Sequence, residues 1–495
     1  MNYTLNIVKI LKLKTTLQRC MSCSTIYSLS SGYGKCGVSV IRVSGPQTKQ
    51  ALQCIVGSKF EPKPRNATLK SLYHPHSNEM IDRGLVLWFP GPNSFTGEDC
   101  CEFQVHGSLA VIAALLDALG KLPGLRAATP GEFTKRAFFG GKLDLTEVDG
   151  LADLIHAETE AQRKQALLQS TGSLSRLYDD WRRRLIRCAA HLEAFIDFAE
   201  DENIEDDIVI SMMQELQQIA AEICAHLNDQ RQGEMLRDGV RTVIIGAPNV
   251  GKSSFMNRMC KRQISIVTPL AGTTRDVIET THNFGGYPVV FFDTAGLRLQ
   301  TRDVVEQEGI DRAKQSINTA DLVLLIMDAK ELVKRKIATN EQLITYQHQY
   351  TTELGLTAET LQQRKLQLII NKIDLLTSEQ LIQLTKLKQV LFISCKVEKE
   401  LDKFLNKFQK LIIEICGLPS PENPRITHVR YRQQLERCIE FINIYLSDYA
   451  PHVYPDMAIA AQKLRKAVKC IERITGHVST DDILDVVFRD FCIGK

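Results

Sequence analysis

The chain has 495 residues, which is too long for a single hydrophobic core and suggests about three domains. Its 61 basic and 58 acidic residues give a net charge of +3, so no overall field marks a nucleic-acid binder, and any such surface must be local. No apolar run is long enough to predict a membrane span, and the scattered cysteines favour free thiols over a zinc site.

The first 27 residues have the composition of a mitochondrial transit peptide. Lys9, Lys12, Lys14 and Arg19 alternate with aliphatic residues, and no acidic residue occurs before Glu61. Basic, amphipathic stretches without acids are typical of such leaders. An ordinary first helix is the alternative interpretation. The prediction is a leader over residues 1–27 and a location in the mitochondrial matrix.

Residues 28–145 are expected to form a compact α+β domain. Short β-rich runs such as GVSVIRVSG and GLVLWFPGP are separated by glycine and proline, and LAVIAALLDALGKL has the pattern of a buried helix. Helical patterns dominate residues 146–237, with an acidic break at 200–207, and return over residues 418–495. The two helical stretches are predicted to be halves of one discontinuous domain.

Residues 238–417, between those halves, alternate strand and helix patterns. The apolar runs are RTVIIGA, VVFFDTAG, DLVLLIMDA, LQLIINKID and VLFISCK. Such alternation predicts a mostly parallel, doubly wound sheet with helices on both faces. An inserted domain needs termini that lie close together, which this fold provides.

The run GAPNVGKS at residues 246–253 matches the phosphate-loop pattern G-x-x-x-x-G-K-[ST] between a predicted strand and a predicted helix. Its glycines let backbone N–H groups curl around a β-phosphate, and the helix N-terminus faces the negative charge. Lys252 is expected to reach the β- and γ-phosphate oxygens, and Ser253 to ligate Mg²⁺. In isolation such a run is also compatible with a fortuitous glycine turn. The motifs that follow it in the sequence decide between the two interpretations.

Three further motifs follow the loop in the order of a GTPase. DTAG begins at Asp293, NKID contains Asn371, Lys372 and Asp374, and SCK begins at Ser394. Asp374 can accept hydrogen bonds from N1–H and the exocyclic amine of guanine, whereas adenine would leave the carboxylate unpaired. GTP is therefore the expected nucleotide, not ATP.

The residue after DTAG is unusual for a GTPase. Many small GTPases place a glutamine there to orient the attacking water. This chain has Leu297, whose side chain forms no hydrogen bond. Either hydrolysis is very slow, or charge stabilisation and water orientation come from elsewhere. Candidates are Asn249, the segment TPLAGTTRD at residues 268–276, and the acidic residues Asp303, Glu306 and Glu308.

Further motifs are spread over all the predicted domains. They are FPGPNSFTGED (89–99), PGEFTKRAF (130–138), KLDLTEVDGLADLI (142–155), AGTTRD (271–276), DTAGLR (293–298) and the terminal CIGK (492–495). Together they resemble the MnmE family of tRNA modification GTPases, also called TrmE, in its mitochondrial form. The resemblance covers nearly everything after the leader.

The resemblance implies an activity, cofactors and an assembly. With a flavoprotein partner, in a heterotetramer, such a GTPase modifies C5 of the wobble uridine of certain tRNAs. The group is of the taurinomethyl type in animal mitochondria and of the carboxymethylaminomethyl type in bacteria. A tetrahydrofolate such as 5-formyltetrahydrofolate binds the N-terminal domain and is linked to the one-carbon unit, while FAD is bound only by the partner. The family dimerises through the N-terminal domain, and K⁺ replaces an arginine finger between the GTPase modules.

The resemblance also assigns site residues by motif. Potassium would be bound by the side chain of Asn249 and the carbonyls of Thr268, Leu270 and Thr273, whereas Thr274 would join Ser253 on Mg²⁺. Glu306 matches the catalytic glutamate that orients water. The implied GTP-binding residues are Asn249, Val250, Gly251, Lys252, Ser253, Ser254, Thr268, Thr273, Thr274, Asp293, Thr294, Ala295, Gly296, Asn371, Lys372, Asp374, Ser394, Cys395 and Lys396.

The implied folate contacts are Arg42, Glu102, Lys142 and Lys495, and Cys492 becomes a candidate reactant. The chain departs from the bacterial pattern near the first of these, with SSGYGKCG where a loop containing proline and arginine is usual. The terminal CIGK also resembles a prenylation box, but lysine is not a usual last residue and glycine is not aliphatic.

Two other functions are compatible with the GTPase motifs. One is a mitochondrial ribosome-assembly GTPase, although such proteins usually append a basic RNA-binding domain and this chain ends in helical sequence. The other is a regulatory switch without chemistry of its own, which Leu297 favours. For tRNA, the arginines of WRRRLIR, beginning at Trp181, are a candidate phosphate contact, and a solvated helix face is an equal alternative.

Overall fold

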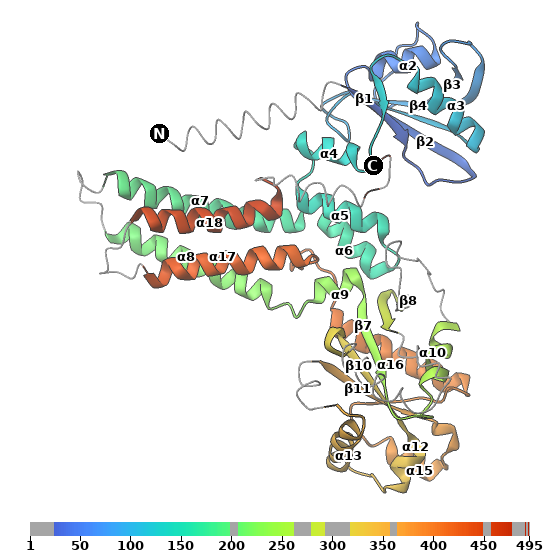
Figure 1. Ribbon diagram of the computed structural model, residues 1–495, viewed down its shortest axis with the longest axis vertical. Helices are drawn as coiled ribbons and strands as arrows, with labels where there is room; N and C mark the ends of the chain where they lie inside the picture. The colour runs from blue at the N-terminus through green and yellow to red at the C-terminus, as the bar shows by residue number, and fades with distance from the viewer. Residues whose placement is uncertain are drawn as a thin grey trace. The chain divides into compact units, whose positions relative to one another are not determined.

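The computed structural model describes residues 24–198, 206–261, 279–292, 317–356, 364–448 and 457–477, together with Phe491 and Gly494 (Figure 1). These residues divide between two compact units. The first lies within Met1–Ala152, Gln169–Asp197 and Met457–Lys495, and the second within Asp153–Leu168 and Phe198–Asp456. Helices from both predicted halves of the helical domain occur in each unit.

The first unit contains a six-stranded sheet with the order β3-β4-β5-β2-β1-β6. β6 pairs parallel with β1, and the other neighbouring strands are antiparallel. The strands are β1 (Thr25–Leu29), β2 (Cys36–Ser44), β3 (Thr68–Tyr73), β4 (Met80–Phe89), β5 (Cys100–Gly107) and β6 (Leu125–Ala127). The runs GVSVIRVSG and GLVLWFPGP form β2 and β4, as predicted.

β1 begins at Thr25, inside the range predicted for the leader. Ile26 is fully buried, and Tyr27 pairs with Val43 on one side and Ala127 on the other. A strand held by ladders on both edges belongs to the folded domain, so the predicted boundary at residue 27 lies too far along the chain. Residues 1–23, which contain most of the predicted leader, are outside the described part of the structure.

Helices cover both faces of this sheet. α2 (Thr48–Val56) and α3 (Leu109–Gly120), the second formed by the predicted apolar helix, pack on a core that includes Ile41, Phe103 and Leu115. On the opposite face lies α4 (Glu132–Phe139), whose Phe133 packs against Ile26 and Ala128. The observed mixture of helices and antiparallel strands confirms the α+β class expected for this region.

Long helices precede and follow residues 238–417 in the sequence. In the first unit α7 (Ser173–Phe198) and α18 (Met457–Thr475) lie side by side (Figure 1), joined by ion pairs of Arg182 with Glu472 and of Arg465 with Glu193. In the second unit α8 (Asp206–Leu227) packs on α17 (Val429–Asp448). The other helices between residues 145 and 238 are α5 (Leu145–His156), α6 (Glu160–Ser170) and α9 (Gln232–Asp238). Within the described ranges, no helix has the length and apolarity needed to cross a membrane.

The second unit contains the other six-stranded sheet, with the order β12-β11-β10-β7-β9-β8. All neighbours are parallel except β8 and β9, an antiparallel pair at one edge. The strands are β7 (Val240–Ile245), β8 (Glu279–Phe284), β9 (Tyr287–Phe292), β10 (Leu322–Asp328), β11 (Lys365–Asn371) and β12 (Val390–Phe392). All five predicted strands occur, and the mostly parallel sheet is confirmed.

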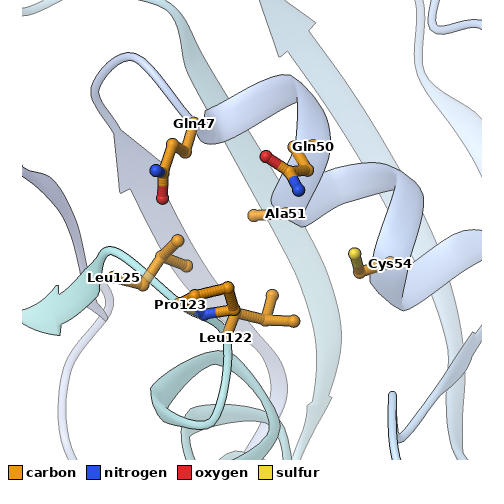
Figure 2. A pocket seen from close by; sticks show the side chains of 7 residues that line it. All are labelled: Gln47, Gln50, Ala51, Cys54, Leu122, Pro123 and Leu125. Atoms are coloured by element: carbon orange, nitrogen blue, oxygen red, sulfur yellow. The ribbon is translucent and has the colours of Figure 1, made fainter.

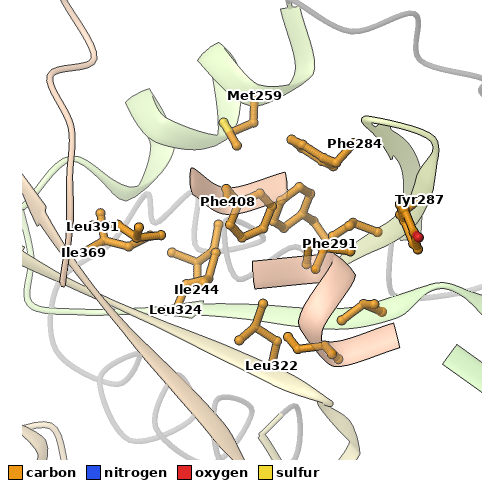
Figure 3. Close-up of a cluster of buried hydrophobic side chains, with 14 of the residues drawn as sticks. Ile244, Met259, Phe284, Tyr287, Phe291, Leu322, Leu324, Ile369, Leu391 and Phe408 are labelled. Carbon is orange, nitrogen blue, oxygen red and sulfur yellow. The ribbon is translucent and has the colours of Figure 1, made fainter. Parts of the chain in front are cut away.

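This sheet is buried on both faces, because successive residues of β10 enter different cores. Leu322, Leu324 and Ile326 face a cluster with α10 (Lys252–Lys261) and α16 (Glu398–Cys416), part of which Figure 3 shows. Val323 and Leu325 face a second cluster. That cluster includes α12 (Ala329–Lys334), α13 (Asn340–Glu353), η2 (Ile373–Leu375) and α15 (Ser378–Leu384). Continuous apolar strands covered on both faces are what a doubly wound sheet requires.

A buried charge network fixes α4 to the N-terminal sheet. The guanidinium of Arg136, whose side chain is 2% exposed, donates to Glu132 at 3.1 Å and to Glu98 at 2.9 Å. Glu132 also accepts from Arg126 at 2.8 Å and from the N–H of Thr129 at 3.0 Å. Burial alone would raise the pKa of Glu132, but these donors outweigh it and lower the pKa to about 2.

We expect Glu132→Gln to lower the free energy of unfolding of this domain by about 3 kcal/mol at pH 7, because it removes the carboxylate of Arg126 and one of the two carboxylates of the buried Arg136. The pKa of Glu132 is lowered from 4.5 to about 2 by folding. The native chain therefore keeps this stabilisation at pH values above the unfolded pKa of 4.5 and loses it as the pH falls toward the folded pKa of about 2. Over this pH range, the free energy of unfolding of the variant should change less than that of the native chain.

The measurement is urea denaturation followed by the fluorescence of Trp88, which lies in β4. A Trp181→Phe background leaves Trp88 as the single tryptophan, since the chain has 2. The matched control is Glu61→Gln, because the side chain of Glu61 is 72% exposed and its loss should change the free energy by less than about 0.5 kcal/mol. Equal stability of the two variants at pH 7 would contradict the role given to the network.

Candidate functional site

The phosphate loop starts where β7 ends, and two of its glycines are required by crowding. A Cβ at Gly246 would lie 2.5 Å from the carbonyl oxygen of Ile326. A Cβ at Gly251, where φ is +102°, would lie 2.3 Å from Nδ2 of Asn371. Neither site can hold a side chain without moving its neighbour, so these glycines let the loop approach the ends of β10 and β11.

Lys252, the first residue of α10, turns its amine back over the loop. Nζ donates to the carbonyl oxygens of Gly246 at 2.7 Å and Ala247 at 2.8 Å, and burial lowers the pKa of the amine. Ser253 and Ser254 follow it and are exposed in the first helical turn. A cation and hydroxyl groups therefore gather at a helix N-terminus, which suits a phosphate ligand.

Asn249 and Val250 lie in the middle of the loop. Asn249 is exposed and has a φ of +62°, a left-handed conformation that asparagine tolerates better than most residues. Val250 is buried, and its carbonyl oxygen accepts a hydrogen bond from Nδ2 of Asn371 at 2.9 Å. The Asn371 amide of the NKID motif thus holds the phosphate loop, and this hydrogen bond joins two of the predicted motifs directly.

The other NKID and SCK residues form a polar cluster beside it. The Ser394 hydroxyl donates to the Asp374 carboxylate at 2.7 Å and accepts from the N–H of Lys396 at 3.2 Å. The amine of Lys372 donates to Asp328, the last residue of β10, at 2.7 Å. These bonds hold Asp374 in place at the carboxyl edge of the sheet, where a base-selecting carboxylate is expected.

Cys395 completes this cluster. Its thiol lies 3.5 Å from Oδ1 of Asn371, and burial raises its pKa, so it remains a neutral thiol. Its carbonyl oxygen accepts from Nε of Arg258 on α10 at 2.8 Å. The predicted GTP-binding residues in the described part of the chain therefore lie in one continuous site.

Three residues at this site were not predicted from the sequence. Asp328 holds Lys372, Arg258 holds the SCK loop, and Tyr350 on α13 bonds to the N–H of Ala247 at 2.7 Å. None belongs to a motif. Asp328 at the end of an apolar strand was the one detectable signal, because carboxyl ends of parallel strands usually border ligands.

Several predicted site residues lie outside the described part of the structure. They are Thr268, Leu270, Thr273, Thr274, Asp293, Thr294, Ala295, Gly296, Glu306, Cys492 and Lys495. Their roles in binding potassium, magnesium, the γ-phosphate and folate therefore stay predictions. Within the described residues, no group of three or more His, Cys, Asp and Glu side chains is placed to hold a metal ion.

Two of the predicted folate contacts meet on the N-terminal sheet. Arg42 on β2 and Glu102 on β5 are register partners, and their side chains form an ion pair at 2.9 Å. The guanidinium lies 5.0 Å from the ring centre of Phe95 and 5.8 Å from that of Phe133. A paired cation and carboxylate beside aromatic rings can bind a flat, polar heterocycle.

Lys142 and Gly494 also lie close to this sheet. The Cε of Lys142 would lie 3.6 Å from a Cβ at Gly97, in the same loop as Phe95. The carbonyl oxygen of Gly494 accepts from the hydroxyl of Ser30 at 2.8 Å. Ser30 follows β1 directly, and β1 pairs with β2, the strand that carries Arg42. This hydrogen bond therefore holds Gly494 close to the strand that neighbours Arg42.

A small hollow in the same domain is a different feature. It lies between α2 and the turn before β6, lined by residues that include Gln47, Cys54 and Leu122 (Figure 2), and has a volume of about 10 Å³. The buried Oε1 of Gln47 has no hydrogen-bond partner within the described ranges. This space is enough for about one water molecule, so it does not compete as a ligand site.

Three of the four arginines that follow Trp181 form ion pairs within their own unit. Arg182 bonds to Glu472, and Arg183 and Arg184 pair with Asp180 on the same helix. Neighbouring carboxylates reduce the attraction of such a patch for phosphates. The observed pairs favour a solvated helix face over a tRNA contact here.

Comparisons with known proteins match the same regions. The family model of the MnmE helical domain matches residues 145–492, and that of the N-terminus of the GTP-binding protein TrmE matches residues 25–142. A mitochondrial 5-taurinomethyluridine-[tRNA] synthase subunit GTPB3 from Danio rerio is 49% identical, covering 95% of this chain and 93% of the relative. The Homo sapiens protein of that name is 44% identical with the same coverage.

A bacterial relative and a solved structure extend the comparison. The tRNA modification GTPase MnmE of Rickettsia typhi is 39% identical, covering 95% of this chain and 100% of the relative. A variant of Era from Aquifex aeolicus, solved with GDP and AlF4−, is 24% identical over 40% of this chain and 65% of its own, with a TM-score of 0.23. That TM-score is too low to support a family assignment, which rests on the family models and the sequence relatives instead. The chain belongs to the MnmE family, whose members are also named TrmE.

Proposed function

We propose that this chain is the GTP-hydrolysing subunit of an enzyme that places a taurinomethyl group on C5 of the wobble uridine of mitochondrial tRNAs. The supporting observation is the extent of the match to relatives named 5-taurinomethyluridine-[tRNA] synthase subunits, which covers 95% of the chain. A ribosome-assembly GTPase or a switch would share the GTPase module alone. The relatives' names also support the mitochondrion as its location, with the matrix as our finer proposal.

In this proposal Asp374 selects guanine. Ser394 holds the carboxylate before the base arrives, which lowers the entropy lost on binding. N1–H and the exocyclic amine of guanine then donate to it. Lys252 supplies positive charge to the β- and γ-phosphates, exchanging loop carbonyl oxygens for phosphate oxygens.

The proposed metal ions complete the phosphate site. Ser253 fits a magnesium ligand, because it is exposed at the N-terminus of α10, and Thr274 would be the second. Asn249 fits a potassium ligand, because its conformation exposes it in the middle of the loop. Thr268, Leu270 and Thr273 would complete the potassium shell. Potassium would supply the charge stabilisation that Leu297 cannot, with Glu306 orienting water.

The N-terminal domain is the proposed folate site. The observed donor and acceptor set fits, since a carboxylate such as Glu102 can accept from the amino and N–H groups of a pterin, and Arg42 holds that carboxylate in place. Lys142 and Lys495 would bind the carboxylates of the glutamate tail. The tetrahydrofolate would supply the one-carbon unit, and Cys492 remains a candidate reactant.

The proposed assembly includes tRNA, a homodimer formed through the N-terminal domain, and a flavoprotein partner that binds FAD in a heterotetramer. This part of the proposal rests on the family's organisation. It predicts that wobble modification needs both proteins, while nucleotide binding needs this chain alone.

Deletion of the gene should remove the C5 group from wobble uridines of mitochondrial tRNAs, measured by mass spectrometry of digested tRNA. Wild-type chain should restore it. Cys492→Ser should not restore it yet should retain GTP hydrolysis, because the thiol is assigned to modification chemistry. Unchanged uridines after deletion, with ribosomal subunits failing to assemble, would overturn the proposed function, and loss of both activities in Cys492→Ser would make that residue structural.

Asp374→Asn should weaken GTP binding by about a hundredfold or more, because an amide cannot accept both guanine donors. The same variant should gain affinity for xanthosine triphosphate, whose O2 can accept from the new amide. Titration with fluorescent nucleotides measures both changes. Asp374→Ala is the matched control and should bind neither nucleotide well, so retention of GTP affinity in both variants would exclude this carboxylate from base selection.

Steady-state GTP hydrolysis should be faster in K⁺ than in Na⁺ at equal ionic strength, because only the larger ion fits the proposed loop. Asn249→Ala should remove most of the difference by deleting one ligand. Asn340→Ala is a suitable control, since Asn340 starts α13 and binds Lys388 instead of the phosphate loop. Equal wild-type rates in the two salts would refute the potassium site.

A further inference from the structure

The hydroxyl of Tyr350 lies between two backbone segments that border the nucleotide site. It accepts a hydrogen bond from the N–H of Ala247 at 2.7 Å and donates to the carbonyl oxygen of Ile326 at 3.1 Å. Tyr350 is on α13 and is 6% exposed. One buried side-chain atom therefore joins the phosphate loop to β10.

The position of this bridge follows from the end of a β-ladder. The register of β7 with β10 ends at Ile245 and Leu325, and the chain then turns away at Gly246 to form the phosphate loop. The N–H of Ala247 and the carbonyl oxygen of Ile326 both belong to residues beyond the last register pair of this ladder. A buried N–H or carbonyl group without a partner is costly, and the Tyr350 hydroxyl satisfies one of each.

We propose that Tyr350 is a positioning residue that fixes the first half of the phosphate loop and, through it, Asn249. Two side chains tie the loop to its surroundings, since Tyr350 holds Ala247 and Asn371 holds Val250. Asn249 lies between these two ties. The effect of Tyr350 on nucleotide binding follows from this geometry. Its effect on potassium binding through Asn249 rests on the proposed function.

Two other observations support a positioning role. Lys252 bonds to the carbonyl oxygen of Ala247, so this residue is held through both its N–H and its C=O. Burial raises the pKa of Tyr350 to about 12, so its hydroxyl keeps the proton that it donates to Ile326 at physiological pH. Loss of the hydroxyl should therefore loosen the loop at the residue that also orients the lysine.

Tyr350→Phe is the informative variant, because it removes one oxygen and keeps the ring. Tyr346→Phe is its matched control: Tyr346 lies one turn earlier on α13, is also 6% exposed, and has its ring 4.7 Å from the Arg335 guanidinium instead of near the loop. Three quantities are measured on the full chain: the dissociation rate of fluorescent GDP, the K⁺ concentration that gives half-maximal GTP hydrolysis, and the melting temperature.

We expect GDP to leave Tyr350→Phe about tenfold faster than the wild type, because a buried carbonyl oxygen and a part-buried N–H group lose their partner in the bound state. The K⁺ concentration for half-maximal hydrolysis should rise severalfold, with the rate at saturating K⁺ partly restored. Tyr346→Phe should change the dissociation rate and the half-maximal K⁺ concentration by less than about twofold each. If the role of Tyr350 were purely structural, Tyr350→Phe would lower the melting temperature and leave the K⁺ dependence of hydrolysis unchanged.

The outcomes separate this inference from the proposed function. If both variants release GDP at the wild-type rate, Tyr350 does not position the loop, whatever the wild-type response to potassium. If wild-type hydrolysis ignores K⁺ but GDP leaves Tyr350→Phe faster than Tyr346→Phe, the bridge to the loop is supported and the potassium proposal fails. If potassium stimulates all three proteins with the same half-maximal concentration, the link to Asn249 is overturned.

Discussion

The nucleotide site depends on the parallel direction of four neighbouring strands. Because β7, β10, β11 and β12 run the same way, their carboxyl ends meet at one edge of the sheet. The phosphate loop leaves β7 there, β10 ends at Asp328, β11 ends at Asn371, and Ser394 follows β12 closely. Motifs separated by more than a hundred residues become neighbours through this one arrangement, as the bond from Asn371 to Val250 shows.

The same edge limits which residues the loops can contain. The backbone at Gly246 approaches β10 so closely that the space left for a Cβ is occupied by the Ile326 carbonyl oxygen. At Gly251 the Asn371 amide fills the corresponding space. The loop is therefore shaped by β10 and β11, which lie on one side of β7, as much as by its own sequence.

Much of this could be predicted from the sequence where the signal was local. The continuous run LVLLIMD predicted a strand buried on both faces, and the spacing of GAPNVGKS predicted its loop. The first three residues of β1 were placed in the leader because they adjoin a basic stretch. Tyr350 was missed because it bonds only to backbone atoms of residues distant in sequence, which leave no pattern. The Arg42 and Glu102 pair, 60 residues apart, came only through family resemblance.

The position of β1 limits where a protease could cut this chain and still leave its first domain folded. β1 is an interior strand that pairs with both β2 and β6, and Ile26 is buried against Phe133 and Ala128. A protease that cut after residue 27 would separate β6 from the rest of the sheet and expose the hydrophobic face of α4. Any processing that leaves a folded domain must therefore cut before Thr25, so the first ladder of the sheet sets the limit for the protease.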